Sequence, residues 1–232
     1  MIGRVARGMK HAVATRIHSM TKTLSRKGLY EFLSREFSVI PTSSKVLTVG
    51  AGGRVTELLY KHARDQDFDV LVLDIDKDHE PDMVGDICNF NFRDFEFDVI
   101  VMSEVLEHVH SPHEALANIH ASLKAGGKLI ITTPFMLPIH DRPYDYYRFT
   151  RYGLEFLLDN FNDVQINERN SYFETIDVLW VRIWQANTRS ARVAGFFIVP
   201  LVFFVKAPMS YFLGMIVDND TMTTGYVVTA NK

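Results

Sequence analysis

The sequence predicts an α/β protein built on a doubly wound, mostly parallel sheet. From residue 45 onward, short and largely apolar runs alternate with helical stretches, which is the pattern of a parallel sheet covered by helices on both faces. A glycine-rich turn at residues 50–53 follows the first run, and Asp74 ends the second. The 232 residues suit one well-cored domain with attachments.

The first 28 residues predict a basic amphipathic arm that precedes a domain over residues 29–232. Of the formal net charge of −3, residues 1–30 contribute +7 and the remainder −10. A basic arm on an acidic body argues against a nucleic-acid-binding protein. It leaves a membrane-surface helix, a solvated arm packed on the domain and an organelle transit peptide as alternatives. Apolar residues recur at helical spacing in this arm: Ile2, Val5, Met9, Val13, Ile17, Met20 and Leu24.

The elements of the domain follow in order. Leu29–Phe37 predicts a short helix that ends before Pro41, and Thr150 is a candidate N-cap for a later helix. Two final strands lack a clear crossover helix between them, which predicts an antiparallel hairpin closing the sheet edge. The expected strands are 45–49, 68–73, 82–87, 97–102, 128–132, 163–168 and 224–229, and the expected helices are 54–63, 111–123 and 150–160.

A hydrophobic helical insertion is predicted at residues 171–220, before the last strand. Pro200, Lys206 and Pro208 interrupt its apolar run, so we expect a buried cap or an interfacial segment rather than a membrane span. Membrane contact, a cap over the acceptor and a homodimer interface remain alternatives. Because no apolar signal segment begins the chain and Cys88 is its lone cysteine, we expect a cytoplasmic protein, peripheral at the membrane at most.

A cofactor site is predicted where the first two strands end. The glycine turn lets the backbone approach a ligand closely, and a helix N-terminus favours anionic or polar groups. Asp74 lies about 20 residues further on, where a carboxylate accepts hydrogen bonds from ribose hydroxyls. These features indicate a Rossmann-like site and leave NAD and S-adenosyl-L-methionine (SAM) as alternatives.

Later motifs separate these two cofactors. Phe97–Val109 (FDVIVMSEVLEHV), then Pro112 and residues 123–134 (LKAGGKLIITTP), closely resemble class I SAM-dependent methyltransferases. The most similar subgroup contains quinone-biosynthesis and glycan-cluster methyltransferases. The resemblance covers roughly Val46–Leu158 and the final strand. It implies a seven-stranded Rossmann-like sheet with an antiparallel last strand, SAM as cofactor and methyltransferase activity.

The resemblance also implies cofactor-binding residues. Asp74 would bind the ribose diol, and Ser103 and Glu104 would line the methyl-donor end. Thr48 stands where the family has an acid and Arg54 where it has a glycine, which leaves a non-catalytic SAM-binding or scaffold protein as the alternative function. The methionine moiety of SAM would lie against Gly50, Ala51 and Gly52, and the adenine against Ile75, Asp86 and Ile87.

The loop that follows the fifth strand is the expected acceptor side. Residues 140–150 (HDRPYDYYRFT) resemble a stretch of methyltransferases associated with surface-polysaccharide synthesis. An oxygen acceptor that must lose a proton needs a base with a near-neutral pKa. His140 is the first candidate and His108 the second, with Asp141 as base or orienter. The expected acceptor-binding residues are Arg142, Tyr144, Tyr146, Tyr147 and Arg148, unless the tyrosines pack and Arg148 pairs with Asp145.

The predicted function is therefore SAM-dependent methylation, at an oxygen, of a small, lipid-linked or glycan-linked acceptor near a membrane. No metal is expected, because His108, His110 and His113, with Glu107 and Glu114, have spacings that do not place three ligands on one face. No nucleic-acid partner is expected either, and a homodimer is left open.

Overall fold

The computed structural model describes residues 2–93, 95–186, 188–217 and 219–232, with side chains described from residue 12 onward. The basic and apolar side chains expected at residues 2–11 lie outside this description. The chain divides into two compact units. The sheet unit comprises Leu29–Phe135, Ile139–Asn167 and Gly225–Lys232, and the helical unit comprises Met1–Gly28, Met136–Pro138 and Glu168–Thr224.

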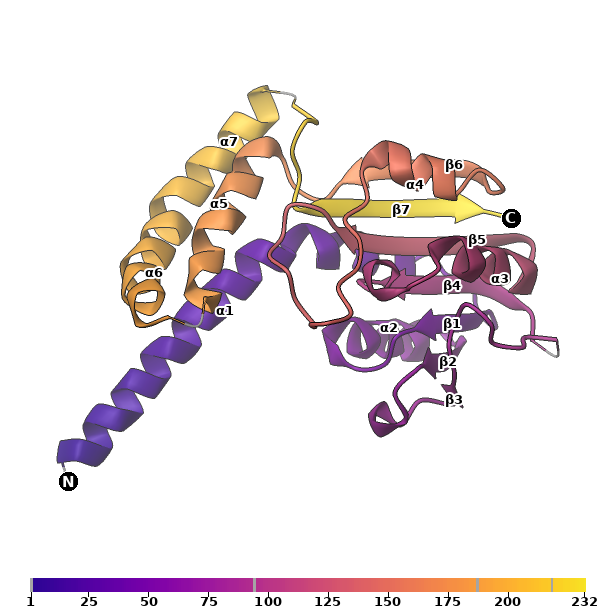
Figure 1. The fold of residues 1–232 in the computed structure, drawn as a ribbon, viewed down its shortest axis with the longest axis horizontal. Helices are drawn as coiled ribbons and strands as arrows, with labels where there is room; N and C mark the ends of the chain where they lie inside the picture. The colour runs from indigo at the N-terminus through magenta and orange to yellow at the C-terminus, as the bar shows by residue number, and fades with distance from the viewer. Residues whose placement is uncertain (1, 94, 187, 218) are drawn as a thin grey trace. The chain divides into compact units, whose positions relative to one another are not determined.

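The sheet unit holds a seven-stranded sheet in the order β3-β2-β1-β4-β5-β7-β6 (Figure 1). β1 pairs in parallel with β2 and β4, β4 with β5, and β2 with β3. The predicted mostly parallel sheet is confirmed. The strands are β1 (Lys45–Val49), β2 (Asp69–Asp74), β3 (Met83–Val84), β4 (Phe97–Ser103), β5 (Leu123–Pro134), β6 (Asn162–Glu168) and β7 (Gly225–Asn231).

The last strand is antiparallel, as predicted, but it does not close the sheet. β7 pairs antiparallel with β5 and lies between β5 and β6. Its side chains are mostly buried, whereas those of β6 are mostly exposed and polar. The more apolar strand therefore takes the interior position, and β6 forms the edge.

Helices cover both faces of the sheet, and side-chain alternation along the strands divides the core in two. On one face Val46 and Val99 pack with the end of α1 (Ile2–Phe37) and with α2 (Gly53–Gln66). On the other, Leu47 and Ile100 pack with α3 (Pro112–Ser122) and α4 (Arg151–Leu157). Short 3-10 turns occur at η1 (Lys77–His79) and η2 (Leu106–His108), and Thr150 caps α4 as predicted.

The helical unit contains the described part of α1 before residue 29 together with the insertion. Ile17 of α1 packs in a small core with Val181, Val199 and Val202. The arm and the insertion therefore share a core. Leu29–Phe37 is the end of the same continuous helix, not the separate short helix that the sequence predicted. The insertion comprises α5 (Tyr172–Arg182), η3 (Ile183–Gln185), α6 (Arg189–Leu201), the π-helical η4 (Val202–Lys206) and α7 (Ala207–Ile216).

Pro200, Lys206 and Pro208, which were expected to interrupt the apolar run, lie within one continuous helical stretch, Arg189–Ile216. Within η4 the N–H of Ala207 donates to Val202 O, five residues back, so the π-helical segment continues the helix after Pro200. Lys206 pairs with the buried carboxylate of Asp177. By length and composition alone, Arg189–Ile216 is long and apolar enough to cross a membrane, and only 22% of its most apolar window is buried.

Gly28 gives a test of packing inside the helical unit. A Cβ placed on Gly28 would lie 2.1 Å from Arg169 O, a backbone atom. We expect Gly28→Ala to lower the free energy of unfolding by about 1–3 kcal/mol, the usual cost of overpacking. For a chain of this size that is roughly 2–4 °C in Tm per kcal/mol, measured by calorimetry. Gly153→Ala in α4 is the control, because its Cβ would meet Thr150 Oγ1 at 3.4 Å, and an unchanged Tm for both variants would contradict the packing.

Candidate functional site

The strand register brings the predicted cofactor residues to one edge of the sheet. Val49 of β1 pairs with Leu73 of β2 and with Met102 of β4. The residues that follow these three positions therefore leave the sheet at the same level. They are Gly50, Asp74 and Ser103.

The turn between β1 and α2 depends on glycine at two positions. Gly50 has φ +89°, and a Cβ there would lie 2.7 Å from Val105 Cγ2. Gly52, the N-cap of α2, has φ +82°. Only glycine adopts this region readily, so the sequence Gly-Ala-Gly folds into a turn whose backbone is open to a ligand.

Asp74 is the most constrained carboxylate at this edge. Its Oδ2 accepts hydrogen bonds from Ala51 N at 2.6 Å and His79 Nδ1 at 3.1 Å, and its Oδ1 accepts from Asp76 N at 2.8 Å. Burial raises the pKa of Asp74, but the backbone and histidine hydrogen bonds outweigh it, so the net shift is downward. The same hydrogen bond and charge raise the pKa of His79.

A pocket joins most of the predicted cofactor residues. Gly50, Asp74, Ile75, Asp86 and Ile87 all line it, together with residues 105 and 108–110. Ala51 contacts Asp74 through its amide, and Gly52 begins α2.

Ser103 and Glu104 are not among the residues that line this pocket. The hydroxyl of Ser103 lies 2.8 Å from Thr132 Oγ1, and Glu104 N donates to Thr132 O. Both therefore lie at the end of β4, tied to β5.

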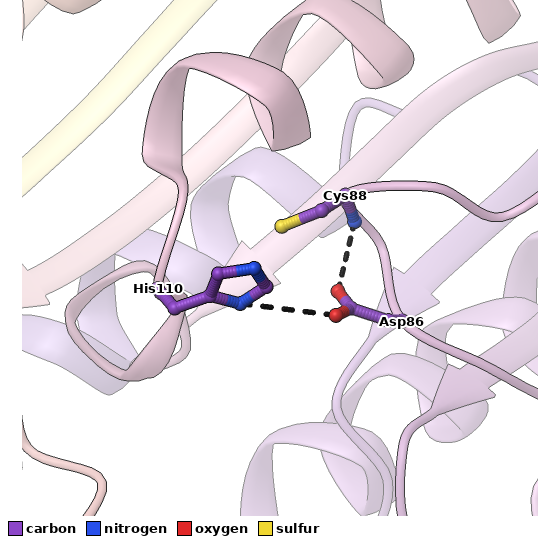
Figure 2. A group of neighbouring side chains, drawn as sticks. All are labelled: Asp86, Cys88 and His110. Carbon is purple, nitrogen blue, oxygen red and sulfur yellow. Dashed lines mark hydrogen bonds and ion pairs between the residues drawn. The ribbon is translucent and has the colours of Figure 1, made fainter.

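Figure 2 shows Asp86, Cys88 and His110 turned toward one another, and Asp86 and His110 line this pocket. Asp86 Oδ1 accepts from Cys88 N, and Asp86 Oδ2 lies 3.8 Å from His110 Nδ1. Burial, together with the neighbouring Asp86, raises the pKa of the Cys88 thiol to about 11. The thiol is therefore protonated at neutral pH and donates to Ser111 O.

The candidate catalytic residues come together, His108 from η2 and His140 and Asp141 from the loop that follows β5. The rings of His108 and His140 lie edge to face with centroids 4.8 Å apart. Their Nε2 atoms lie 3.8 and 3.9 Å from Asp141 Oδ2, and 3.6 and 3.7 Å from Oε1 of the buried Glu107. We call these four side chains the imidazole–carboxylate cluster. Burial lowers the pKa of His140 despite the opposing charge of Asp145, so His140 is neutral at neutral pH.

The acceptor-side loop is held by an internal ion pair. Arg148 Nη2 donates to Asp145 Oδ2 at 2.7 Å, and this bonding lowers the pKa of Asp145 to about 2. Asp145 Oδ2 also accepts from His140 N, and Arg148 Nη2 lies 3.5 Å from His140 Nδ1. The structure thus places Arg148 in the pairing that the sequence left as an alternative. The exposed side chains of this loop include Arg142, Tyr144, Tyr146 and Tyr147.

The sequence did not reveal the roles of Glu107 and His79, and it left the pairing of Asp145 with Arg148 as an alternative. Glu107 stands beside His108 in a motif read as a family signature, and no sequence pattern shows that His140 reaches it. Asp145 and Arg148 are three residues apart, which is the one local signal of their pairing. His79 follows Asp74 by five residues in a turn-rich stretch that carries no periodicity.

Comparison with known proteins identifies a family. Residues 17–167, more than half of the chain, match a family described as "Methyltransferase domain". A curated "Ubiquinone biosynthesis O-methyltransferase" of Coxiella burnetii (strain Dugway 5J108-111) is 32% identical over 126 residues, covering 49% of this chain and 51% of that protein. The chain therefore spans about half the length of the curated relatives that it matches.

Solved structures share the fold. One is phosphoethanolamine N-methyltransferase 2 of Haemonchus contortus in complex with SAM, with TM-score 0.56, 16% identity and coverage of 89% of this chain and 52% of that chain. Another is a SAM-dependent methyltransferase of Archaeoglobus fulgidus, with TM-score 0.58, 16% identity and coverage of 89% and 94%. At these identities the likeness concerns the fold alone.

Proposed function

Because this chain belongs to the class I SAM-dependent methyltransferase family, we propose that it transfers a methyl group from SAM to a hydroxyl oxygen of a small, lipid-linked or glycan-linked acceptor. One observation carries the proposal. His108 of η2 lines the same pocket as Gly50 and Asp74 and also belongs to the imidazole–carboxylate cluster, so the two groups of residues adjoin.

The residues at the strand ends fit SAM. Gly50 has a positive φ, and a side chain there would collide with Val105, so this position stays glycine and its backbone can approach a ligand closely. Asp74 is ionised at neutral pH and is placed to accept from the ribose hydroxyls. Ile75 is 72% exposed and offers an apolar face to adenine, next to Asp86 and Ile87 in the same pocket. SAM, when bound, supplies a methyl group on a sulfonium sulfur, which is already a good leaving group.

The chain's own task is then to align the acceptor and remove its proton. His140 is neutral at neutral pH, so its imidazole can accept the proton of an acceptor hydroxyl. His108 lies beside it, and the carboxylate of Asp141 stabilises either ring once it is protonated. The curated O-methyltransferase relatives favour oxygen as the atom that receives the methyl group.

The acceptor-side loop supplies the binding groups. Arg142 is exposed and is our candidate for an anionic group on the acceptor. Arg148 is committed to Asp145 and acts by holding the loop. Tyr144 and Tyr146 are also exposed, which suits stacking on a ring or sugar face.

We further propose that the helical unit contacts a membrane surface. The helix Arg189–Ile216 buries Gly195, Val199 and Ser210 and leaves a broad apolar face exposed. Arg189 and Arg192, both exposed, stand at its start and suit anionic headgroups. Surface contact is favoured over a span because Lys206 of this helix pairs with Asp177 of α5. Exposed apolar side chains include Val193, Phe196, Phe197, Leu201, Phe204, Met209, Phe212, Met215 and Ile216.

The alternative function is a SAM-binding or scaffold protein that does not methylate. Thr48 favours it, since this residue is buried in β1 and offers a hydroxyl where the family has a carboxylate. Measuring SAM binding and methyl transfer on the same protein distinguishes the two functions. The alternative requires SAM binding without methyl transfer to any acceptor.

Asp74 and His79 predict how cofactor affinity depends on pH. We expect Asp74→Ala to weaken S-adenosylhomocysteine binding at least tenfold by calorimetry, because it removes charge-assisted hydrogen bonds worth about 1.5–3 kcal/mol. We expect a ribose hydroxyl to compete with His79 for Asp74 Oδ2, to which His79 Nδ1 is hydrogen-bonded. Its raised pKa keeps part of it charged at neutral pH, so raising the pH through that pKa weakens the competition.

Affinity should therefore increase from about pH 6 to about pH 9, and His79→Ala should bind as well or better with less pH dependence. An Asp74→Ala variant that binds like the unmodified protein would contradict the ribose role.

The proposed role of His140 as general base predicts how its replacement changes kcat. With tritiated SAM and a panel of phenols, polyprenyl-linked sugars and free glycans, we expect His140→Ala to lose about 10²–10⁴-fold in kcat, the usual contribution of a general base. His113→Ala is the control, since this exposed histidine lies on α3 away from the cluster. Binding of S-adenosylhomocysteine with no methyl transfer to any acceptor would favour the alternative function.

Vesicle sedimentation tests the membrane contact. Replacing Phe197, Phe204 and Phe212 by Ser should reduce binding to phosphatidylglycerol-containing vesicles at least tenfold, because each buried aromatic ring is worth about 1.5–3 kcal/mol. Tyr152→Ser with Phe156→Ser, equally exposed on α4, is the control. Equal pelleting of both variants would contradict the proposal. A loss of dimer instead, seen by light scattering, would make the face a homodimer interface.

A further inference from the structure

The helical unit contains a cavity of its own. Its volume is about 340 Å³, which is within the usual range of small-molecule sites. Residues of α1, of α5 and of the continuous helix Arg189–Ile216 form its walls, and all of them belong to the helical unit. Most of the lining side chains are apolar, which suits a hydrocarbon ligand. They include Leu24, Val178, Phe203, Ala207, Pro208 and Tyr211.

Asp177 of α5 lines this cavity with a buried carboxylate. The residue is 1% exposed. Its Oδ1 accepts a hydrogen bond from Lys206 Nζ, whereas its Oδ2 has no hydrogen-bond partner among the described residues. A buried acceptor without a donor is destabilising, and such an atom in a native protein usually indicates a bound partner. A ligand in the cavity that carries a hydroxyl would supply the donor.

The charges around the cavity favour a neutral ligand. Lys27 and Glu174 line it together with Asp177, and Lys206 pairs with Asp177. The two cations therefore balance the two carboxylates. Lys27 Nζ lies 5.0 Å from the centroid of the Tyr211 ring, and Glu174 forms the capping box of α5. A carboxylate on the ligand would meet Asp177 and Glu174 and would bring no donor, so an alcohol fits better than a fatty acid.

The cavity lies along the helix for which we proposed membrane contact. Pro208, Tyr211 and Phe212 line the cavity and are exposed on α7. Pro208, Phe212 and the exposed Met215 follow one another at steps of four and three, so they share one face of the helix. The exposed apolar face therefore continues from the proposed membrane contact to the cavity.

We propose that this cavity binds the hydrocarbon chain of a neutral membrane amphiphile, such as a fatty alcohol or a monoacylglycerol, whose hydroxyl donates to Asp177 Oδ2. The chain replaces water against the apolar walls, and the hydroxyl satisfies the buried carboxylate oxygen. The supply of this ligand from a membrane rests on the proposed membrane contact. Binding of a soluble alcohol is measurable without vesicles, so failure of the cavity as a site and failure of the membrane contact are distinguishable.

The test is calorimetric titration of the full chain, without vesicles, with 1-octanol, 1-nonanol and 1-decanol below their solubility limits. We expect each added methylene to tighten binding about fourfold, the usual gain for a buried CH₂. 1-Methoxynonane has the same number of heavy atoms as 1-decanol but no donor, and decanoate carries a charge. We expect both to bind at least tenfold more weakly than 1-decanol, because neither donates a hydrogen bond to Asp177.

Two variants connect this binding to the cavity. Ala207→Phe should fill the cavity and weaken 1-decanol binding at least tenfold. Ala194→Phe is the matched control, because Ala194 lies on the same continuous helix, is also partly exposed and does not line the cavity. Asp177→Asn should remove the preference for 1-decanol over 1-methoxynonane, because its amide nitrogen donates to either oxygen. Circular dichroism checks the folding of each variant.

The proposal is overturned if the unmodified chain does not bind 1-decanol up to its solubility limit. It is equally overturned if 1-decanol, 1-methoxynonane and decanoate bind alike, because Asp177 then selects no hydroxyl. A folded Ala207→Phe variant that keeps binding while Ala194→Phe loses it would place the alcohol outside this cavity and would also contradict the proposal.

Discussion

The backbone register between β1, β2 and β4 is the constraint on which the site depends. Parallel hydrogen bonding aligns the last residues of these strands, and each chain then leaves the sheet at the same edge. A slip of one residue would turn each strand's apolar side chains from one core to the other. Because apolar cores pack on both faces of the sheet, the register is strongly specified. The packing of the two cores against the faces of the sheet therefore sets the positions of the cofactor residues at its edge.

Glu107 connects this edge to the acceptor-side loop. Its carbonyl oxygen accepts hydrogen bonds from the amides of Tyr146 and Tyr147, and its carboxylate faces His108 and His140. The backbone of this one buried residue thus hydrogen-bonds to the loop, and its carboxylate lies near the two imidazole rings. The Asp145–Arg148 pair completes the arrangement from within the loop. The loop is consequently an ordered wall of the site rather than a connection between elements.

The sequence was informative wherever structure follows from local pattern. Apolar runs gave the strands to within a few residues, apart from β3 and β5, and Thr150 predicted its helix start. The position of β7 inside the sheet was not predictable, since it depends on competition between β6 and β7 for a buried place. The continuity of the insertion helix was hidden because Pro200 normally breaks a helix, and the π-helical hydrogen bond from Ala207 to Val202 has no sequence signature.

For the site too, local patterns could be predicted and tertiary contacts could not. Gly50 and Asp74 could be located because a turn and a strand end fix their positions. His108 and His140 could be chosen by chemistry, but their contact requires two distant segments to fold together. Asp141 was predicted as a base or an orienter, and its Oδ2 lies 3.8 and 3.9 Å from the Nε2 atoms of His108 and His140. The partnership of Glu107 with these rings is a tertiary effect that no spacing reveals.

The reactivity of the Cys88 thiol depends on whether the protein is folded. It is the single thiol of the chain, and folding raises its pKa from 9.0 to about 11. Near neutral pH the reactive thiolate is thus scarcer in the folded state than in the unfolded chain. Alkylation at this one atom is accordingly slower in the folded protein than in the unfolded chain, and its rate reports the folded state without any introduced label.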